Sequence, residues 1–293
     1  MPDPLALYQP ATLDEAIRLL DELGDEAKVV AGSTALTIML RQRLIAPSAL
    51  ISIGRLPDLD RIEVTDGELA IGALVRHRDV ELSPLVRERL PVLAHTFGVV
   101  ANVRVRNAAT VGGVLAESDY ASDPPAVFVA LDAVVDVQGP TGRRSIPASE
   151  FFIAFYETAL EPNELVIGVR VPLPPPGTGA VYEKYVTRSS EDRPCVGVAA
   201  VARLADDGTL AHLAVAVGAA AETPQRYPDV ESTAIGQAPD DALLRRIADG
   251  YAERVDPLDD LRGSAWYRRE MVRVWVRRAI EGALADARTA TPA

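Results

Sequence analysis

The chain contains little cysteine, histidine or tryptophan, and it has no long apolar run. Cys195 is the single cysteine among 293 residues, which excludes a disulfide framework and an iron–sulfur cluster held by this chain's own thiolates. The three histidines, His77, His95 and His212, are too widely spaced to form a metal-binding motif. No segment approaches the roughly 20 apolar residues of a membrane span. The sequence therefore predicts neither a metal site nor a span.

The charge balance is acidic. Asp and Glu number 42 against 30 Lys and Arg, which gives a formal net charge of −12. An overall negative field repels nucleic acids and anionic membranes, so neither is expected as a partner. The first residues, Met1-Pro-Asp-Pro-Leu5, have no basic region and no apolar run of the kind found in signal peptides. Together with the single cysteine, this leads us to expect a cytoplasmic protein.

The most informative stretch is residues 107–125, NAATVGGVLAESDYASDPP. The pair Gly112-Gly113 suits a close backbone approach or a positive φ, and Thr110 and Ser122 can donate hydrogen bonds. Asp123 before Pro124 is typical of a helix N-cap followed by proline at the first helical position. Such a turn can present backbone N–H groups to an anion, but paired glycines also occur in ordinary tight turns.

A second stretch of this kind lies near the N-terminus. The apolar Val29-Val30 leads into Ala31-Gly32-Ser33-Thr34-Ala35-Leu36 and then into a predicted helix over 34–42. Strands predicted at 28–30 and 49–53 complete a βαβ unit, which implies parallel strands. The turn between strand and helix fits a phosphate site and an empty turn equally well.

Elsewhere the pattern predicts an α+β protein. Thr12 and Glu15 have the spacing of a capping box, and Asp66-Gly67 indicates a hairpin within 62–71. Further predicted helices and strands are as follows: helices at 13–23, 85–100, 124–130, 240–254 and 264–285; strands at 134–138, 145–146, 164–171, 181–187, 196–204 and 210–217.

A proline-rich segment, Pro172-Leu-Pro-Pro-Pro-Gly177, predicts a division into two domains because it is stiff and cannot continue a ladder. Residues 1–175 would form the first domain, with a small parallel βαβ subdomain at 1–56 and a mixed or antiparallel sheet with helices at 57–175. Residues 178–288 would form a C-terminal domain with a three-stranded antiparallel sheet and helices.

The two loops in this order resemble the FAD-binding medium subunit of the molybdenum hydroxylases, the family of carbon monoxide dehydrogenase and xanthine dehydrogenase. There an Ala-Gly-Gly-x-Ser loop and a Thr-[Ile/Val]-Gly-Gly-Asn loop together wrap the FAD pyrophosphate. Almost the whole chain takes part in the resemblance, because Arg106-Asn107, Ala130-Leu-Asp-Ala133 and residues 262–269, RGSAWYRR, also match. Two positions depart from the family: Ser33 replaces a glycine that is usual there, and Val114 replaces an asparagine.

The resemblance implies a set of FAD-binding residues and no catalytic residue or metal ligand in this chain. It implies that Asp123 helps to hold FAD and that Lys184 lies near the flavin, where its charge would stabilise the reduced form. From the residues alone, an N-cap is the plain interpretation of Asp123, and a solvated strand lysine is the favoured interpretation of Lys184. The full set is Ala31, Gly32, Ser33, Thr34, Ala35, Leu36, Arg106, Thr110, Val111, Gly112, Gly113, Val114, Ser122, Asp123 and Lys184.

The resemblance also implies partner subunits. A small subunit would carry two [2Fe-2S] clusters and a large one the molybdenum cofactor, in a dimer of heterotrimers. Electrons from the substrate would pass through the clusters to FAD in this chain and on to an external acceptor. Two alternatives stay open: a flavin-free structural or assembly subunit, and a free-standing flavin oxidase of related fold. The substrate and the final acceptor are not encoded in this chain.

Overall fold

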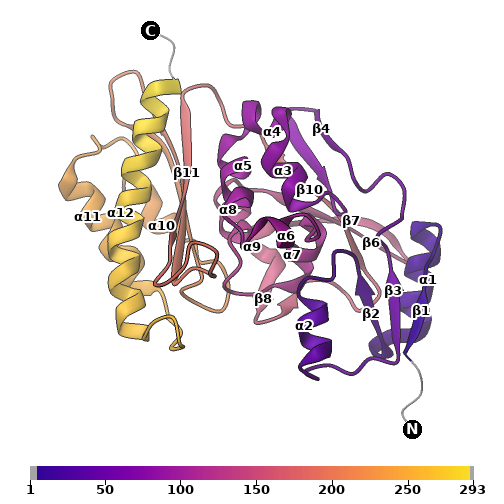
Figure 1. Cartoon of the computed structure of the whole chain (residues 1–293). Helices are drawn as coiled ribbons and strands as arrows, with labels where there is room; N and C mark the ends of the chain where they lie inside the picture. Colours follow the sequence, from indigo (N-terminus) through magenta and orange to yellow (C-terminus); the bar gives the residue numbers. More distant parts are fainter. Residues whose placement is uncertain (1–4, 291–293) are drawn as a thin grey trace.

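The computed structural model describes residues 5–290, which build three regions side by side (Figure 1). An N-terminal region holds a three-stranded sheet, a middle region holds a five-stranded sheet with most of the short helices, and a C-terminal region holds a second three-stranded sheet covered by long helices. This arrangement confirms the predicted α+β class and its order of subdomains.

The N-terminal sheet is parallel, with the order β1-β3-β2, as a βαβ unit requires. Helix α1 packs on it through Ala16, Ile17 and Leu20, because these apolar residues recur at helical spacing. The strand β1 was missed by the sequence analysis, since it is only three residues long. The elements are β1 (Ala6–Tyr8), α1 (Leu13–Leu23), η1 (Gly24–Glu26), β2 (Ala27–Val30), α2 (Leu36–Arg41) and β3 (Ala49–Ser52).

The predicted capping box at the start of α1 forms only in part. The Thr12 hydroxyl accepts a hydrogen bond from the Glu15 N–H at 3.2 Å, as expected of an N-cap. The Glu15 carboxylate, however, accepts from the N–H of Ala11 at 2.8 Å and not from that of Thr12. The helix still begins and ends at the predicted residues.

The middle region is built on an antiparallel sheet with the order β4-β5-β10-β6-β7. The helix predicted over 85–100 is in fact two helices, because Pro91 lacks an N–H and starts a new helix after Leu90. The elements are β4 (Ile62–Thr65), β5 (Glu68–Gly72), α3 (His77–Leu82), α4 (Pro84–Arg89), α5 (Pro91–Gly98), α6 (Val103–Arg106), α7 (Val111–Glu117), α8 (Pro124–Ala130), β6 (Val134–Gly139), β7 (Gly142–Pro147), α9 (Ala148–Phe151), β8 (Phe152–Ala154), β9 (Glu157–Thr158) and β10 (Leu165–Pro172).

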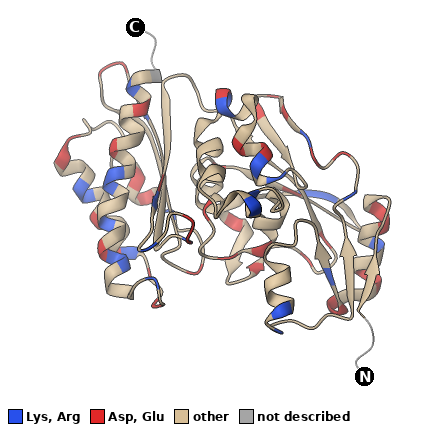
Figure 2. Cartoon of the chain, in the orientation of Figure 1, with Lys and Arg blue, Asp and Glu red and all other residues tan. Residues whose placement is uncertain are grey.

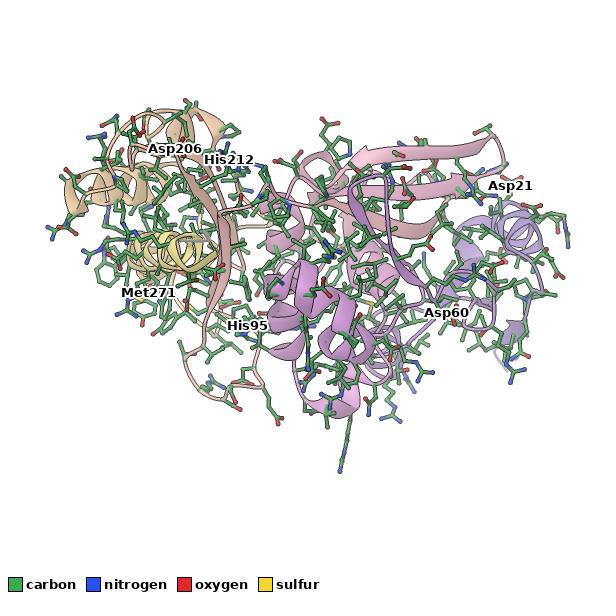
Figure 3. All side chains as sticks on the ribbon, turned by 90° about the horizontal axis from the view of Figure 1, so that it is seen from above. Asp21, Asp60, His95, Asp206, His212 and Met271 are labelled. Atoms are coloured by element: carbon green, nitrogen blue, oxygen red, sulfur yellow. The ribbon has the colours of Figure 1, made fainter. Side chains whose placement is uncertain are left out.

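The C-terminal sheet is a wall shared by two hydrophobic cores (Figure 1; Figure 3). Along β12, Val198 and Ala200 face α11 and α12, while Ala199 and Val201 face the middle region, because successive strand residues point to opposite sides. Apolar residues of α12 are buried in the core between this helix, α11 and the sheet, which we call the outer core: Val272, Val276, Ala279, Ile280 and Ala283. The elements are β11 (Thr178–Tyr185), β12 (Val196–Leu204), β13 (Leu210–Gly218), α10 (Pro228–Ser232), α11 (Asp241–Arg254) and α12 (Ala265–Ala290).

Charged residues of both signs alternate over the helices of the C-terminal region (Figure 2). Many form ion pairs within or between helices, such as Arg277 with Glu281 at 2.9 Å and Arg273 with Asp249 at 2.6 Å. Between residues 5 and 290, none of the helices combines the length and the apolar character needed to cross a bilayer.

Candidate functional site

The two small-residue loops predicted from the sequence lie against each other. A Cβ added to Gly32 would lie 2.0 Å from the carbonyl oxygen of Ala108 and 3.0 Å from the Cα of Ala109. Real Cβ atoms do not approach backbone this closely, so only glycine allows the first loop, residues 31–35, to touch the second loop, residues 107–113. The fold thus brings together two stretches that are about 75 residues apart in sequence.

The first loop presents a row of free backbone donors. The N–H groups of Gly32, Ser33, Thr34 and Ala35 have no acceptor within residues 5–290. Ser33 has φ 60°, a left-handed conformation that favours glycine, so the residue usual in the family suits this position. Successive N–H groups around a left-handed residue form a concavity that binds anions. Helix α2 begins at Leu36, two residues later than predicted, because this turn comes first.

The second loop differs from the prediction, because the backbone donors of Val111, Gly112 and Gly113 are already used. The N–H groups of Val111 and Gly112 donate to the carbonyls of Val75 and Ala73 at 2.9 and 2.8 Å. The N–H of Gly113 donates to the Thr110 hydroxyl at 3.1 Å, which caps α7. The expectation that these N–H groups face an anion is therefore corrected.

The paired glycines of the second loop serve packing and not an unusual backbone angle. Neither Gly112 nor Gly113 has a positive φ. Gly112 is buried, and a Cβ there would lie 2.6 Å from the Ala73 side chain, so the glycine lets α7 approach the end of β5. Gly113 is exposed, and its added Cβ would meet only the Thr110 hydroxyl, at 2.8 Å.

Asp123 and Lys184 meet across the boundary between the middle and C-terminal regions. Lys184 Nζ lies 3.0 Å from Asp123 Oδ2 and donates to the Val99 carbonyl at 2.7 Å. The other carboxylate oxygen of Asp123 accepts from the Tyr182 hydroxyl at 2.8 Å. Burial raises the pKa of Asp123, and the Lys184 charge opposes that rise. Asp123 is the N-cap residue of α8, with Pro124 at the first helical position as predicted, but its side chain makes no capping hydrogen bond. Lys184 is not a solvated lysine, so that interpretation was wrong.

Three other predicted site residues have side chains that either bind other groups of the protein or are at least partly buried. Arg106 pairs with Glu81 at 2.9 Å and donates to the carbonyls of Val100 and Ala101, so its guanidinium holds the α5–α6 turn. Val114 is buried and offers no polar atom. Ser122 is half-buried just before Asp123. Their contacts with a cofactor stay predictions.

Two aromatic residues that could have stacked on a cofactor ring are used in packing. Tyr120 lies edge-on to Phe155 and its hydroxyl hydrogen-bonds Asp260. Tyr185 stacks on Trp275, and the bond from its hydroxyl to that of Tyr267 is the largest of the causes that raise the pKa of Tyr185 to about 12. Both rings therefore pack within the protein, as single aromatic residues usually do.

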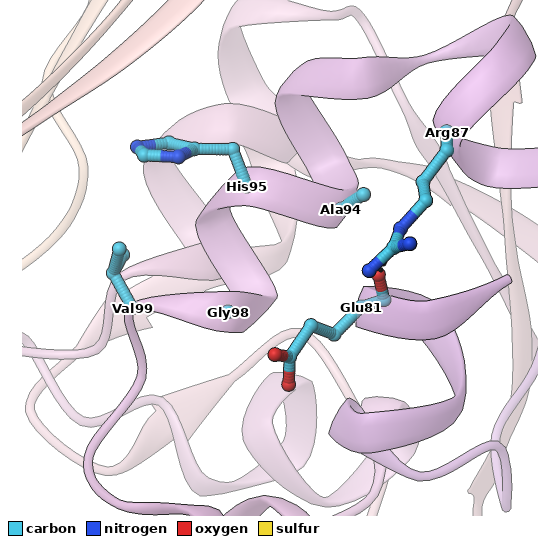
Figure 4. Close-up of a pocket in the computed structure, with 6 residues that line it drawn as sticks. All are labelled: Glu81, Arg87, Ala94, His95, Gly98 and Val99. Carbon is cyan, nitrogen blue, oxygen red and sulfur yellow. Dashed lines mark hydrogen bonds between the residues drawn. The ribbon is translucent and has the colours of Figure 1, made fainter.

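Two surface hollows lie in the N-terminal and middle regions. One, of about 300 Å³, is lined by Gln9, Pro10, Ala11, Ser52 and Arg55, at the carboxyl ends of β1 and β3. Ligands of open parallel sheets bind at this edge. The other hollow, of about 370 Å³, lies between α3 and α5, where Arg87 donates to the Glu81 carbonyl (Figure 4). Its Glu81 carboxylate already pairs with Arg78 and Arg106 and is not free for a ligand.

Three groups beside the loops were not predicted to be site residues. Tyr182 shares a strand face with Lys184, and the spacing of two residues was the signal that could have revealed it. The buried Asp119 forms an ion pair with Arg193 at 2.5 Å, which connects the segment after β11 to the middle region. His77 begins α3 under the second loop, and its N–H donates to the Ala109 carbonyl at 2.9 Å.

His77 is an uncharged histidine in the interior. It is 2% exposed and lies edge-on to Phe97, and neither ring nitrogen has a hydrogen-bond partner among the residues described. The pKa of His77 is lowered to about 4, chiefly by burial; the Thr110 backbone opposes this shift, and the Arg106 charge adds a smaller lowering. The second loop therefore rests on a side chain that stays neutral at physiological pH.

We expect this histidine to make the protein sensitive to acid. Because the unfolded chain takes up the proton near pH 6.5 and the folded chain only near pH 4, stability should fall as the pH drops between these values. The loss from His77 alone is about 3 kcal/mol. Urea unfolding from pH 7 to pH 4 should show a shallower decline for His77→Phe, while His95→Gln, at an exposed site, keeps the wild-type slope. Parallel curves for His77→Phe and wild type would contradict this.

The chemistry of the donor set fits a dinucleotide cofactor. The first loop offers four N–H groups for a phosphate, and Thr110 and Lys184 are polar groups of neighbouring elements. A glycine with no room for a Cβ holds the two loops together. Adjacent free N–H groups of this kind suit an anionic group such as a phosphate.

Comparisons with known proteins match both parts of the chain. Residues 3–174 match the family described as FAD binding domain in molybdopterin dehydrogenase, and residues 181–283 match the CO dehydrogenase flavoprotein C-terminal domain. The carbon monoxide dehydrogenase medium chain of Hydrogenophaga pseudoflava is 36% identical over 97% of this chain and 99% of its own. A subunit of the 6-hydroxypseudooxynicotine dehydrogenase complex of Paenarthrobacter nicotinovorans is 33% identical over 94% of this chain and 93% of its own.

Solved structures show the same similarity in three dimensions. Carbon monoxide dehydrogenase from Hydrogenophaga pseudoflava contains a chain that superposes with a TM-score of 0.94 at 36% identity, covering 98% of this chain and 99% of that one. Quinoline 2-oxidoreductase from Pseudomonas putida 86 contains a chain with a TM-score of 0.90 at 28% identity, covering 100% of both.

Proposed function

The chain belongs to the FAD-binding medium subunits of carbon monoxide dehydrogenase and xanthine dehydrogenase type oxidoreductases, and from this premise we propose that it binds FAD between its two loops and passes electrons from a partner subunit to an external acceptor. FAD, when bound, supplies the redox chemistry, and the protein supplies binding, orientation and electrostatics.

The observation that carries this proposal is the row of free N–H groups in the first loop, held beside the second loop by Gly32. These groups would donate to the pyrophosphate. Thr110 would contribute its hydroxyl, while Val111, Gly112 and Gly113 would shape the loop without donating their N–H groups. Lys184 would place its charge beside the flavin, in a position fixed by Asp123. Leu36 would close the first loop from the start of α2.

The electron donor is proposed to be an iron–sulfur chain. A single cysteine leaves this chain unable to ligate a cluster. We therefore propose a small subunit with two [2Fe-2S] clusters and a large subunit with the molybdenum cofactor, assembled as a dimer of heterotrimers. Relatives are named medium chains of carbon monoxide and glyceraldehyde dehydrogenases, names that support a multi-subunit assembly. Residues 1–175 and 178–288 are proposed as the FAD-binding and C-terminal domains.

We expect the endogenous protein to purify with a cysteine-rich iron–sulfur chain and with one FAD for each copy of this chain. The physical reason is that the electrons that leave FAD must first have reached it through a neighbouring chain. Native mass spectrometry of the complex, followed by flavin absorbance and FAD titration of the separated apo-chain, makes the measurement.

Each part of the proposal has its own contrary result. A complex that contains the iron–sulfur chain but no flavin, with an apo-chain that does not bind added FAD, would identify a flavin-free assembly subunit. A flavin-containing chain that occurs alone at near-physiological concentration would identify a free-standing flavin oxidase. Either result would replace the proposed electron-transfer role.

A further inference from the structure

Tyr182 occupies the far end of a buried chain of hydrogen bonds that leads to Lys184. Its hydroxyl donates to Asp123 Oδ1 at 2.8 Å, and Asp123 Oδ2 lies 3.0 Å from Lys184 Nζ. We propose that Tyr182 is a positioning residue for the cofactor, which acts through Asp123 to aim the Lys184 ammonium at bound FAD. This inference rests on the proposed FAD-binding function.

Counting the donors of Lys184 shows why its direction is fixed. An ammonium group has three N–H donors. One reaches the Val99 carbonyl at 2.7 Å and a second reaches Asp123, and no third acceptor is found within residues 5–290. The Lys184 side chain is 8% exposed, so its aliphatic part is confined. Two anchors and a confined stem leave one donor with a defined direction for an incoming ligand.

The pairing of β11 with β12 leaves space for the Tyr182 side chain. Tyr182 and Lys184 are two residues apart on β11 and therefore share the face toward the middle region. The neighbouring strand β12 has Gly197 opposite Lys184. A Cβ at Gly197 would lie 2.2 Å from the Tyr182 hydroxyl oxygen. Only a glycine there lets the hydroxyl reach Asp123.

Asp123 depends on Tyr182 for its charge as well as its orientation. Besides burial, the groups that act on the Asp123 carboxyl are Lys184 and Tyr182 on β11 and Arg193 on the following segment, and all three favour the ionised form. Loss of the Tyr182 hydroxyl removes one donor to the carboxylate, so the pKa of Asp123 rises further. A protonated Asp123 no longer attracts the Lys184 ammonium, so the direction of that ammonium group is no longer fixed.

A structural tyrosine elsewhere in the chain provides a matched control. The Tyr251 hydroxyl is also buried and also contacts a buried carboxylate, Glu231 Oε1, at 2.9 Å, and it donates to the Val215 carbonyl at 2.7 Å. It belongs to the outer core between β13 and α11. Tyr251→Phe therefore removes an equivalent hydroxyl from a place where no cofactor is proposed.

The experiment compares Tyr182→Phe and Tyr251→Phe with wild type in the full chain, by FAD titration of the apo-protein between pH 5 and pH 8. For Tyr182→Phe we expect a dissociation constant raised about tenfold at pH 7. We also expect its affinity to decline at a higher pH than that of wild type as the solution is made acidic. Tyr251→Phe should bind FAD as wild type does at every pH, even if its thermal unfolding temperature falls.

A third variant, Lys184→Met, separates failure of this inference from failure of the proposed function. Wild type that does not bind FAD would overturn the proposed function itself. If wild type binds FAD and Lys184→Met binds it equally well, Lys184 is not aimed at the cofactor and the inference is overturned. It is also overturned if Lys184→Met binds weakly while Tyr182→Phe keeps the wild-type affinity and pH profile, because Tyr182 then has only a structural role.

Discussion

Gly32→Ala is expected to abolish tight FAD binding and to lower the free energy of unfolding by about 3 kcal/mol, near the upper end of the cost of overpacking. The new Cβ would lie 2.0 Å from the Ala108 carbonyl oxygen, and the neighbour is backbone, which cannot turn aside as a side chain can. The two loops must therefore separate. If FAD binding draws them together again, a cost of this size weakens binding by roughly a hundredfold.

Gly54→Ala is the matched control for this change. Gly54 lies close to the first loop, and a Cβ there would have the Ala31 carbonyl oxygen as its nearest neighbour, at 3.9 Å, an ordinary contact distance. FAD titration and urea unfolding of both apo-variants make the comparison. Wild-type FAD affinity in Gly32→Ala would show that contact between the loops is not needed for the cofactor.

Asp123→Ala is expected to destabilise the protein by about 3–5 kcal/mol, because it leaves the buried Lys184 ammonium without its counter-charge. The side chains of both partners are nearly inaccessible to water, with exposures of 4% and 8%, so solvent cannot replace the lost carboxylate. The Tyr182 hydroxyl loses its acceptor as well. Urea unfolding of the apo-protein at pH 7 gives the size of the effect.

The double variant Asp123→Ala, Lys184→Met tests the physical reason. Removing both charges leaves no unpaired ion, so it should recover most of the stability that Asp123→Ala loses. If the double variant is as unstable as the sum of both single variants, the loss comes from packing and the ion pair is not its cause. FAD affinity should stay low in the double variant, since the cofactor-facing charge is absent.

The sequence predicted the architecture well where local signals were strong. The parallel pairing of β2 and β3 followed from the βαβ pattern, and the hairpin at Asp66-Gly67 followed from its turn residues. The two loops were identified as site candidates from their small residues. Local patterns could not supply the burial of a side chain. The residues alone therefore favoured a solvated Lys184 and did not reveal that the carboxylate of Asp123, at the predicted N-cap, pairs with it.

The sequence also did not predict that the two loops differ in how many of their backbone N–H groups are free. Both loops have glycine and hydroxyl residues, but free N–H groups occur in the first, while those of Val111 and Gly112 are used by Ala73 and Val75. Those acceptors lie some 35 residues earlier in the chain. Whether a backbone donor is free depends on tertiary neighbours, and sequence periodicity does not report them.

Gly197 also has a consequence for how the C-terminal sheet assembles. From Val196 to Ala202 both faces of β12 are apolar, so a slip by one residue against β11 would place no polar side chain of this segment in a core. Such a slip would, however, carry Val196 or Val198 to the position where only glycine spares the Tyr182 hydroxyl. The missing side chain of Gly197 thus favours the observed register of β11 and β12. In a chain with the wrong register, Asp123 would lose its hydrogen bond from the Tyr182 hydroxyl.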